Sequence, residues 1–159
     1  MAQLRSRLVR GSPIPLTALL AAFAAAGCGD ASGVGRTVSV GGRITLDGAP
    51  LTAAGTVVLF KPDAAKGNAS PWEPTGTVDG QGNYTLFTKG KRGAPPGWYK
   101  VIVTAFKAQA DEVKGPRLKL PVPKSLVPAR YGQAATTPLS VEAVENPAPE
   151  AYDLKLVGG

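Results

Sequence analysis

A chain of 159 residues, 43% of them hydrophobic, is long enough to fold as one domain around a core of its own. Its 20 glycines and 15 prolines favour short strands joined by tight turns, and its single cysteine excludes an intramolecular disulfide. The formal net charge is +7, but the basic residues form no dense stripe with interleaved aromatic residues, so we expect no nucleic-acid partner.

The first 27 residues have the layout of a secretory signal peptide. Three arginines make the start of this segment positively charged: Arg5, Arg7 and Arg10. An apolar run follows over residues 14–26, shorter than the roughly 20 apolar residues that a membrane-spanning helix needs. We therefore expect residues 1–27 to be removed during export, which leaves 15 of the 18 basic residues against 11 acidic ones, a net charge of +4.

The end of this segment resembles the bacterial lipobox, in which small residues precede an obligatory cysteine. Ala25, Ala26 and Gly27 stand before Cys28, with Ala25 in the place where leucine is commonest. The resemblance implies that the Cys28 thiol is acylated and that the protein is lipid-anchored in the bacterial cell envelope, at the periplasmic face or the cell surface. The alternative is a small, buried free cysteine. Because small and polar residues follow, we expect residues 28–36 to form a flexible lipidated tether.

Alternating apolar side chains predict a β-rich domain over residues 37–157, beginning with a half-buried strand over residues 38–46. The side chains that share its inner face are Val38, Val40, Ile44 and Leu46. Asp47 and Gly48 end this strand with a hairpin turn. Residues 55–60 form a continuous apolar and β-branched run, which is typical of a central strand buried on both faces.

The middle of the chain predicts a loop and then a second hairpin. Prolines interrupt residues 61–74, which we interpret as a loop, and a short strand is expected over residues 75–78. Residues 79–83 combine Asp, Gly and Asn in a turn. The strand that follows carries Tyr84 and Leu86 on one face.

The second half of the chain predicts three more strands. After a Pro-Pro-Gly turn at residues 95–97, a strand carries one apolar face: Tyr99, Val101, Val103 and Ala105. Residues 107–135 are rich in proline and are expected to form a long loop, before final strands around residues 139–143 and 152–156. Seven short strands with turn residues between them, and no amphipathic helical spacing after the apolar leader, predict an all-β sandwich.

Four motifs in this domain resemble the carboxypeptidase-regulatory-like domains, which are transthyretin-like sandwiches. They are the strand and hairpin of residues 42–51, the turn and strand of residues 79–86, the Pro-Gly-x-Tyr-x-Val pattern of residues 96–101, and residues 127–131 followed by residues 137–139. The resemblance covers roughly residues 38–156 and implies a seven-stranded Greek-key β-sandwich in a small bacterial lipoprotein. The family has no single activity, so the resemblance implies fold and context rather than a function.

Two tryptophans are the candidate contact residues. Trp98 falls on the strand face opposite Tyr99, and Trp72 lies in the preceding loop, so exposed rings could stack on a sugar or a partner. The alternative, which we favour, is that the second sheet or the long loop covers Trp98, since large aromatic side chains are usually at least partly buried. We expect Tyr131 to act as a plug that pins the long loop onto the sandwich.

We expect no metal site and no cofactor. At residues 79–83 the alternative to a turn is a small calcium loop, but only Asp79 is charged there and calcium needs about six to eight oxygens. A zinc site without histidine or a free cysteine would be unusual. The turn is therefore the favoured interpretation.

The composition also argues against catalysis. Transthyretin-like hydroxyisourate hydrolases and intradiol dioxygenases of related topology rely on histidine, which this chain lacks, and a serine triad would lack its usual base. A carboxylate-dependent hydrolase is less favoured, because the 11 acidic residues are scattered and only Asp111 and Glu112 are adjacent.

We therefore expect a non-catalytic, lipid-anchored envelope protein that acts as a binding or scaffolding module. Its partners would be the membrane, through the lipid, and other envelope proteins or polysaccharide. The alternative is a carbohydrate-binding module that uses Trp72 and Trp98.

Overall fold

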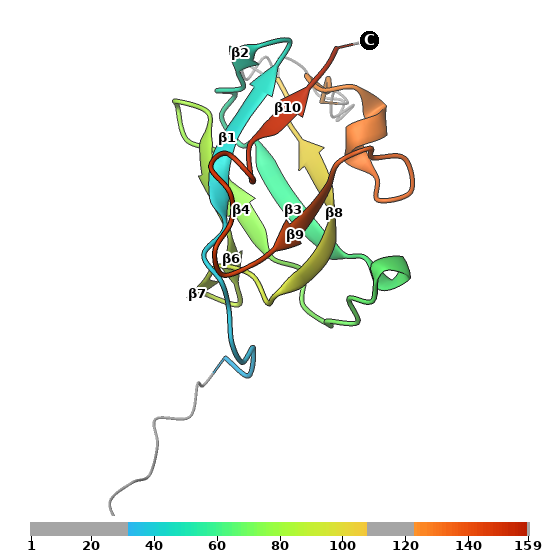
Figure 1. Cartoon of the computed structure of the whole chain (residues 1–159). Helices are drawn as coiled ribbons and strands as arrows, with labels where there is room; N and C mark the ends of the chain where they lie inside the picture. The colour runs from blue at the N-terminus through green and yellow to red at the C-terminus, as the bar shows by residue number, and fades with distance from the viewer. Residues whose placement is uncertain (1–31, 108–122, 159) are drawn as a thin grey trace, which may run out of the picture.

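Ten strands and two short 3-10 helices make up the described part of the chain, residues 32–107 and 123–158 of the computed structural model (Figure 1). The predicted signal peptide, Cys28 and most of the predicted long loop lie outside these residues. The strands form two sheets with almost no helix beside them, which confirms the all-β expectation. Within the described residues, no helix is long and apolar enough to cross a membrane.

Four strands form the smaller sheet: β1 (Gly41–Leu46), β2 (Ala49–Pro50), β5 (Asn83–Thr85) and β10 (Leu154–Leu156). The larger sheet has six strands in the order β7 (Lys91–Arg92), β6 (Phe87–Thr88), β4 (Thr75–Thr77), β3 (Val57–Pro62), β8 (Gly97–Thr104) and β9 (Ser140–Ala143). The 3-10 helices are η1 (Ala64–Lys66) and η2 (Ala129–Gly132).

The core lies between the two sheets and follows the predicted alternation. Its fully buried side chains from both sheets include Ile44, Val58, Phe60, Tyr99, Val101, Val103, Leu154 and Leu156. Burial of a side chain of this size stabilises the fold by roughly 1.5–3 kcal/mol. All members of the core among the described residues lie between Val38 and Leu156, so a chain that begins after Cys28 keeps this core.

Strand β1 organises the smaller sheet because it changes partner halfway along. Residues 41–43 pair antiparallel with β5, whereas residues 44–46 pair in parallel with β10. The predicted hairpin after β1 is confirmed, since Asp47 (φ 51°) and Gly48 (φ 83°) both adopt the left-handed conformation of a two-residue turn. The first and last strands of the described domain are therefore neighbours.

The segment that leads into β10 approaches β1 most closely at Gly42. A Cβ atom at this position would lie 2.4 Å from the carbonyl oxygen of Tyr152. The same oxygen accepts a hydrogen bond from the buried Tyr84 hydroxyl at 2.6 Å, and the Arg43 N–H donates to Asp153 Oδ1 at 2.8 Å. Three segments that are far apart in the sequence therefore meet at one carbonyl group.

Two of the predicted strands differ from those observed in burial or pairing, and not only in their end residues. The outer face of β3 is half-buried at Val57 and Leu59 rather than fully buried, because the described sheets form two layers and β3 turns this face away from the core. The strand predicted after Asn83 is divided into two at Leu86. The part before Leu86, β5, belongs to the smaller sheet, and the part after it, β6, belongs to the larger sheet. Leu86 itself is fully buried where the chain passes from one sheet to the other.

Tyr131 holds the described end of the long loop, which confirms the predicted plug. It lies in η2, its ring is buried, and its hydroxyl accepts a hydrogen bond from the Val157 N–H at 2.9 Å. That hydrogen bond lowers the pKa of Tyr131 below its ordinary value. The neighbouring Arg130 guanidinium donates to the carbonyl groups of Val157 and Gly158, so η2 is fastened to the chain beyond β10.

Contacts with the sandwich begin within the predicted tether. Val34 is only 7% exposed, the Lys91 ammonium donates to the Gly35 carbonyl group, and Arg36 forms an ion pair with Glu145. The contacts of Gly35 and Arg36 attach the end of this segment to the sandwich.

Replacing Gly42 by alanine is expected to lower the free energy of unfolding by about 1–3 kcal/mol, the usual cost of forcing atoms into a packed site. The matched control is Gly80→Ala, because no atom lies within 4 Å of the added Cβ there. That change should stay within about 0.5 kcal/mol of the wild type. Urea unfolding measures both, and equal stabilities of the two variants would contradict the close approach at Gly42.

Candidate functional site

Cys28, the predicted lipidation site, lies outside the described residues, whereas both candidate tryptophans lie within them. Trp98 stands on the outer face of β8, and Trp72 lies in the loop between η1 and β4. Both residues are half-buried, and no ring contact joins the two in the described part of the chain. The fold therefore does not bring them together as a stacked pair.

A lysine covers one face of each tryptophan ring. Lys66 Nζ, from η1, lies 3.8 Å from the centroid of the Trp98 ring, and Lys89 Nζ lies 4.2 Å from that of Trp72. Such cation–π contacts are worth about 0.5–1 kcal/mol at exposed sites. Trp98 is thus partly buried, which is the favoured alternative of the sequence analysis. The side chain that covers its ring comes from η1 and not from the second sheet, because alternation along β8 turns Trp98 away from the core.

The loop between β3 and β4 is fastened to β8 through the main chain of Trp98. The Asp63 N–H donates to the Trp98 carbonyl oxygen at 2.9 Å, and the side-chain amide of Asn68 donates to the same oxygen at 2.8 Å. This loop carries Trp72 as well as the lysine that covers Trp98. One loop therefore borders both rings.

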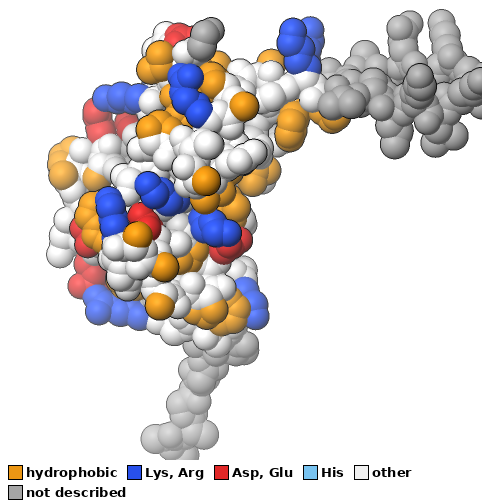
Figure 2. Space-filling model, turned by 90° about the vertical axis from the view of Figure 1, so that its right-hand side faces the viewer, with side chains coloured by type: hydrophobic (Ala, Val, Ile, Leu, Met, Phe, Trp, Pro, Cys, Tyr) orange, Lys and Arg blue, Asp and Glu red, His pale blue; other side chains and the backbone are white. Residues whose placement is uncertain are grey.

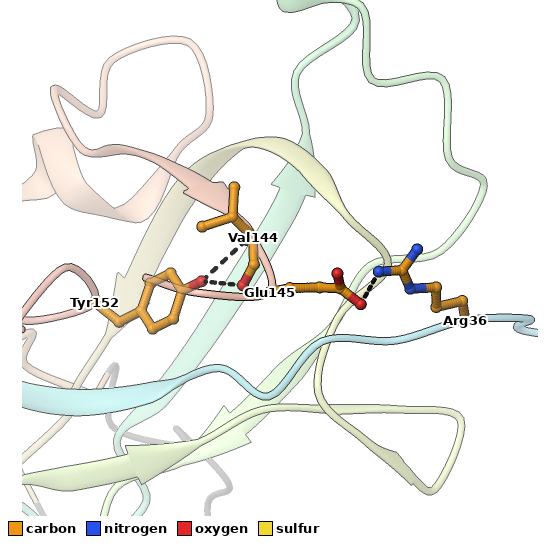
Figure 3. A network of polar contacts seen from close by, with 4 residues as sticks. All are labelled: Arg36, Val144, Glu145 and Tyr152. Atoms are coloured by element: carbon orange, nitrogen blue, oxygen red, sulfur yellow. Dashed lines mark hydrogen bonds and ion pairs between the residues drawn. The ribbon is translucent and has the colours of Figure 1, made fainter. Parts of the chain in front are cut away.

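A shallow groove lies between the start of β1, β5 and the segment that leads into β10. Two arginines and two acidic residues are among those that line it: Arg43, Arg92, Glu145 and Asp153. In Figure 3, Glu145 points toward Arg36, its ion-pair partner. The Tyr152 hydroxyl beside it accepts a hydrogen bond from the Val144 N–H at 3.1 Å and donates to the Val144 carbonyl group at 3.2 Å.

Both carboxylates of this groove have structural partners. Glu145 is paired with Arg36, and Asp153 accepts the main-chain N–H of Arg43. Two acids on one groove are what a carboxylate-dependent hydrolase would require. Here these groups hold the segment before β1 and the segment before β10 in place.

Residues 79–83 form a turn held by the Asp79 carboxylate. Its Oδ1 accepts the N–H groups of Gln81 and Asn83, both at 2.8 Å, and its Oδ2 accepts the side-chain amide of Asn83 at 3.1 Å. These bonds lower the pKa of Asp79, the main-chain N–H of Asn83 having the largest effect. The turn interpretation is confirmed. Among the described residues, no group of three or more His, Cys, Asp or Glu side chains could hold a metal ion.

Two buried tyrosine hydroxyls also donate hydrogen bonds to main-chain carbonyl groups. Tyr84 donates to the Tyr152 carbonyl group, and Tyr99 donates to the Pro95 carbonyl group at 2.8 Å. Burial raises the pKa of both hydroxyls, because the charged phenolate would lose its hydration. These phenols therefore stay protonated near neutral pH and act as hydrogen-bond donors.

Charged side chains are dispersed over one face of the domain. On the face shown in Figure 2, apolar and neutral side chains separate the Lys and Arg side chains. The ion pairs Arg36–Glu145 and Lys61–Glu73 are both largely exposed, so each contributes about 0–1 kcal/mol. Surface charge therefore adds little to the stability of the fold.

The β6–β7 hairpin was not predicted, although the sequence contains a signal for it. Lys89 (φ 48°) and Gly90 (φ 81°) form its two-residue turn, and strands of two residues are too short to show an alternating pattern. The hairpin leaves Phe87, Lys89 and Arg92 exposed. That signal was Phe87. Alternation along the chain places this large apolar side chain on the face opposite to Tyr84 and the buried Leu86, and so away from the core.

Comparison with protein-family models, with curated proteins and with solved structures gives no match to this chain. The function must therefore be inferred from the residues themselves. The two sources are the sequence around Cys28 and the chemistry of the described surface.

Raising the pH above about 10 is expected to destabilise the fold through Tyr84. A tyrosine of the unfolded chain ionises near pH 10, whereas burial raises the pKa of Tyr84 in the folded state. The folded state then holds the proton more tightly than the unfolded state. This contribution to stability is therefore complete below about pH 10 and is lost progressively above it.

Tyr84→Phe removes this titration and also leaves the Tyr152 carbonyl group without its donor, which costs roughly 1–2 kcal/mol near pH 7. Urea unfolding at a series of pH values on both sides of pH 10 should show a shallower decline for the variant than for the wild type. Parallel declines would contradict the assignment of this pH dependence to Tyr84.

Proposed function

We propose that this protein is a lipid-anchored envelope protein whose β-sandwich acts as a non-catalytic binding or scaffolding module. The observation that carries the proposal is the single cysteine, Cys28, which follows an arginine-rich start, an apolar run and small residues. A folded domain comes soon afterwards, since the Gly35 carbonyl group already accepts the Lys91 ammonium of the sandwich. The protein would be exported, cleaved before Cys28 and held at the periplasmic face or the cell surface of a bacterium.

Acylation of Cys28 would hold the domain firmly at a membrane. Each buried methylene of an acyl chain contributes about 0.8 kcal/mol, and stable anchoring takes more than one chain. The sequence has no second cysteine, so no intramolecular disulfide competes for this thiol. The stability of the anchored domain would then come from packing and hydrogen bonds.

We also propose that the sandwich belongs to the transthyretin-like, Greek-key class of the carboxypeptidase-regulatory-like domains. Three of the motifs behind this resemblance fall on local structures that suit them. Residues 47–48 form the β1–β2 turn, residues 79–83 form a turn that ends in β5, and residues 96–101 open β8 with Tyr99 and Val101 in the core. These placements support the fold class, and a fold class alone does not define an activity.

Binding is favoured over catalysis because two carboxylates and two buried tyrosine hydroxyls of the described domain are engaged with the main chain. The Asp79 and Asp153 carboxylates accept main-chain N–H groups, and the Tyr84 and Tyr99 hydroxyls donate to carbonyl groups. The partners that fit an anchored module of this kind are other envelope proteins or polysaccharide.

Carbohydrate binding is the second candidate function. The observation that favours it is the single loop that carries Trp72 and also supplies Lys66 above Trp98, so that two half-buried rings border one segment. Aromatic rings can stack on the apolar faces of sugars, with the polar edge of the indole left for hydrogen bonds. In both rings, however, one face already contacts an ammonium group.

Intact-mass analysis of the membrane-extracted protein tests the anchor. The expected result is loss of residues 1–27 and a mass increase that corresponds to acyl chains, because the lipobox resemblance implies both steps. Cys28→Ser is the matched control and should yield an unacylated protein that lacks this mass increase. A wild-type chain that is unprocessed, or soluble and unmodified, would overturn the proposed function.

Glycan-array screening of the domain tests the second candidate. If the tryptophans bind a sugar, Trp72→Ala or Trp98→Ala should weaken the signal roughly tenfold, which corresponds to about 1.4 kcal/mol. Phe106→Ala serves as a control, because Phe106 is an exposed aromatic residue outside this loop. An array without a signal, or one that the tryptophan variants leave unchanged, would remove carbohydrate binding from consideration.

A further inference from the structure

The chain enters the sandwich beside the β6–β7 hairpin (Figure 1). Thr37 Oγ1 donates to the Arg92 carbonyl group at 3.0 Å, and Val38 forms a β-bridge with Ala94. This end of the domain lies at the bottom of Figure 1, and the C-terminus lies at the top. The hairpin therefore shares one end of the domain with the segment that leads back to Cys28.

The hairpin turns an apolar and a basic side chain outward. Phe87 pairs with Arg92, and Thr88 pairs with Lys91. Thr88 is buried and its hydroxyl donates to the Gly93 carbonyl group at 2.7 Å. Because side chains alternate along a strand, Phe87 points away from the core and is 46% exposed.

Positive charge gathers on this hairpin. Residues 87–93 contain three cationic side chains and no acidic one: Lys89, Lys91 and Arg92. The ammonium group of Lys89, at the turn, lies over the half-buried ring of Trp72. We call Trp72, Phe87, Lys89 and Arg92 the hairpin patch, a set that combines two aromatic rings with two exposed cations.

We propose that the hairpin patch rests on the anionic lipid surface of the membrane that holds the acylated Cys28, an inference that depends on the proposed function. Cations are attracted to anionic headgroups, and each Lys or Arg near such a surface strengthens binding roughly fivefold. Aromatic side chains favour the boundary between headgroups and acyl chains. The patch therefore carries both kinds of side chain that contact a membrane surface.

The length of chain between the anchor and the domain brings the patch close to the lipid. Gly35, whose carbonyl group accepts the Lys91 ammonium of the hairpin, is seven residues after Cys28. A fully extended chain spans about 3.3–3.6 Å per residue, so Gly35 can lie at most roughly 25 Å from the acylated cysteine. Electrostatic attraction acts over a Debye length of about 8 Å at physiological salt, so it favours the orientation in which the patch touches the surface.

Vesicle cosedimentation of a chain that begins at Gly29 tests the patch without the anchor. This chain keeps the whole described core, and thermal unfolding confirms that it is folded. The vesicles are made of phosphatidylcholine with or without phosphatidylglycerol. We expect binding to the anionic vesicles at low salt, weaker binding at high salt and none to the neutral vesicles.

The variants locate the contact. Lys89→Glu combined with Arg92→Glu should weaken binding to the anionic vesicles at least about tenfold, and Phe87→Ala should weaken it severalfold. Lys124→Glu combined with Lys155→Glu changes the net charge equally, on exposed residues in the long loop and in β10, and should change binding less than about threefold. Equal losses in the two double variants, or no binding of the wild-type domain to anionic vesicles, would overturn the proposal.

Negative results in the vesicle experiment and in the mass analysis can be told apart, because they reject different proposals. The chain that begins at Gly29 carries no acyl group, so a negative vesicle result rejects the patch and leaves the anchor proposal intact. An unacylated Cys28 in the membrane extract would instead reject the anchor, and with it the proposal that the patch rests on the anchoring membrane.

Discussion

Closure of the sandwich depends on the main-chain carbonyl group of Tyr152. It lies against Gly42 of β1 and accepts the buried Tyr84 hydroxyl of β5, so it joins the segment before β10 to two strands of the smaller sheet. The chain cannot form an intramolecular disulfide, so packing and hydrogen bonds tie the first and last strands together. Glycine at position 42 permits this approach, because a Cβ atom would overlap the carbonyl oxygen.

Local patterns predicted the features that local forces determine. Period-two alternation identified the buried faces of β1, β8 and β10, and turn residues identified the Asp47–Gly48 hairpin and the Asp79 turn. The partners of β1 could not be predicted, because pairing with β5 and β10 joins residues far apart in the sequence. The division of the predicted strand into β5 and β6 at Leu86 could not be predicted for the same reason. Buried residues on both sides of Leu86 continue one alternating pattern, although β5 and β6 belong to different sheets.

The candidate contact residues were predicted less completely than the fold. The sequence placed Trp98 on the outer face of its strand, but not the lysine of η1 that covers the ring, because a cation–π contact depends on how a loop folds back. It did not predict the β6–β7 hairpin, whose exposed Phe87 and Arg92 become neighbours only through pairing of two short strands. Surface sites formed by loops and hairpins therefore required the structure, whereas Cys28 was a candidate from the sequence alone.

A double-mutant cycle between Gly42→Ala and Tyr84→Phe tests the role of the Tyr152 carbonyl group most directly. Both changes act on this group, so the second change disrupts less once the first has been made. The loss of unfolding free energy in the double variant should therefore be smaller than the sum of the two single losses, by at least about 0.5 kcal/mol. The control cycle replaces Tyr84→Phe by Tyr131→Phe, whose hydroxyl contacts Val157 instead and should combine with Gly42→Ala additively. Additivity in both cycles, measured by urea unfolding, would contradict the claim that the three segments meet at one shared contact.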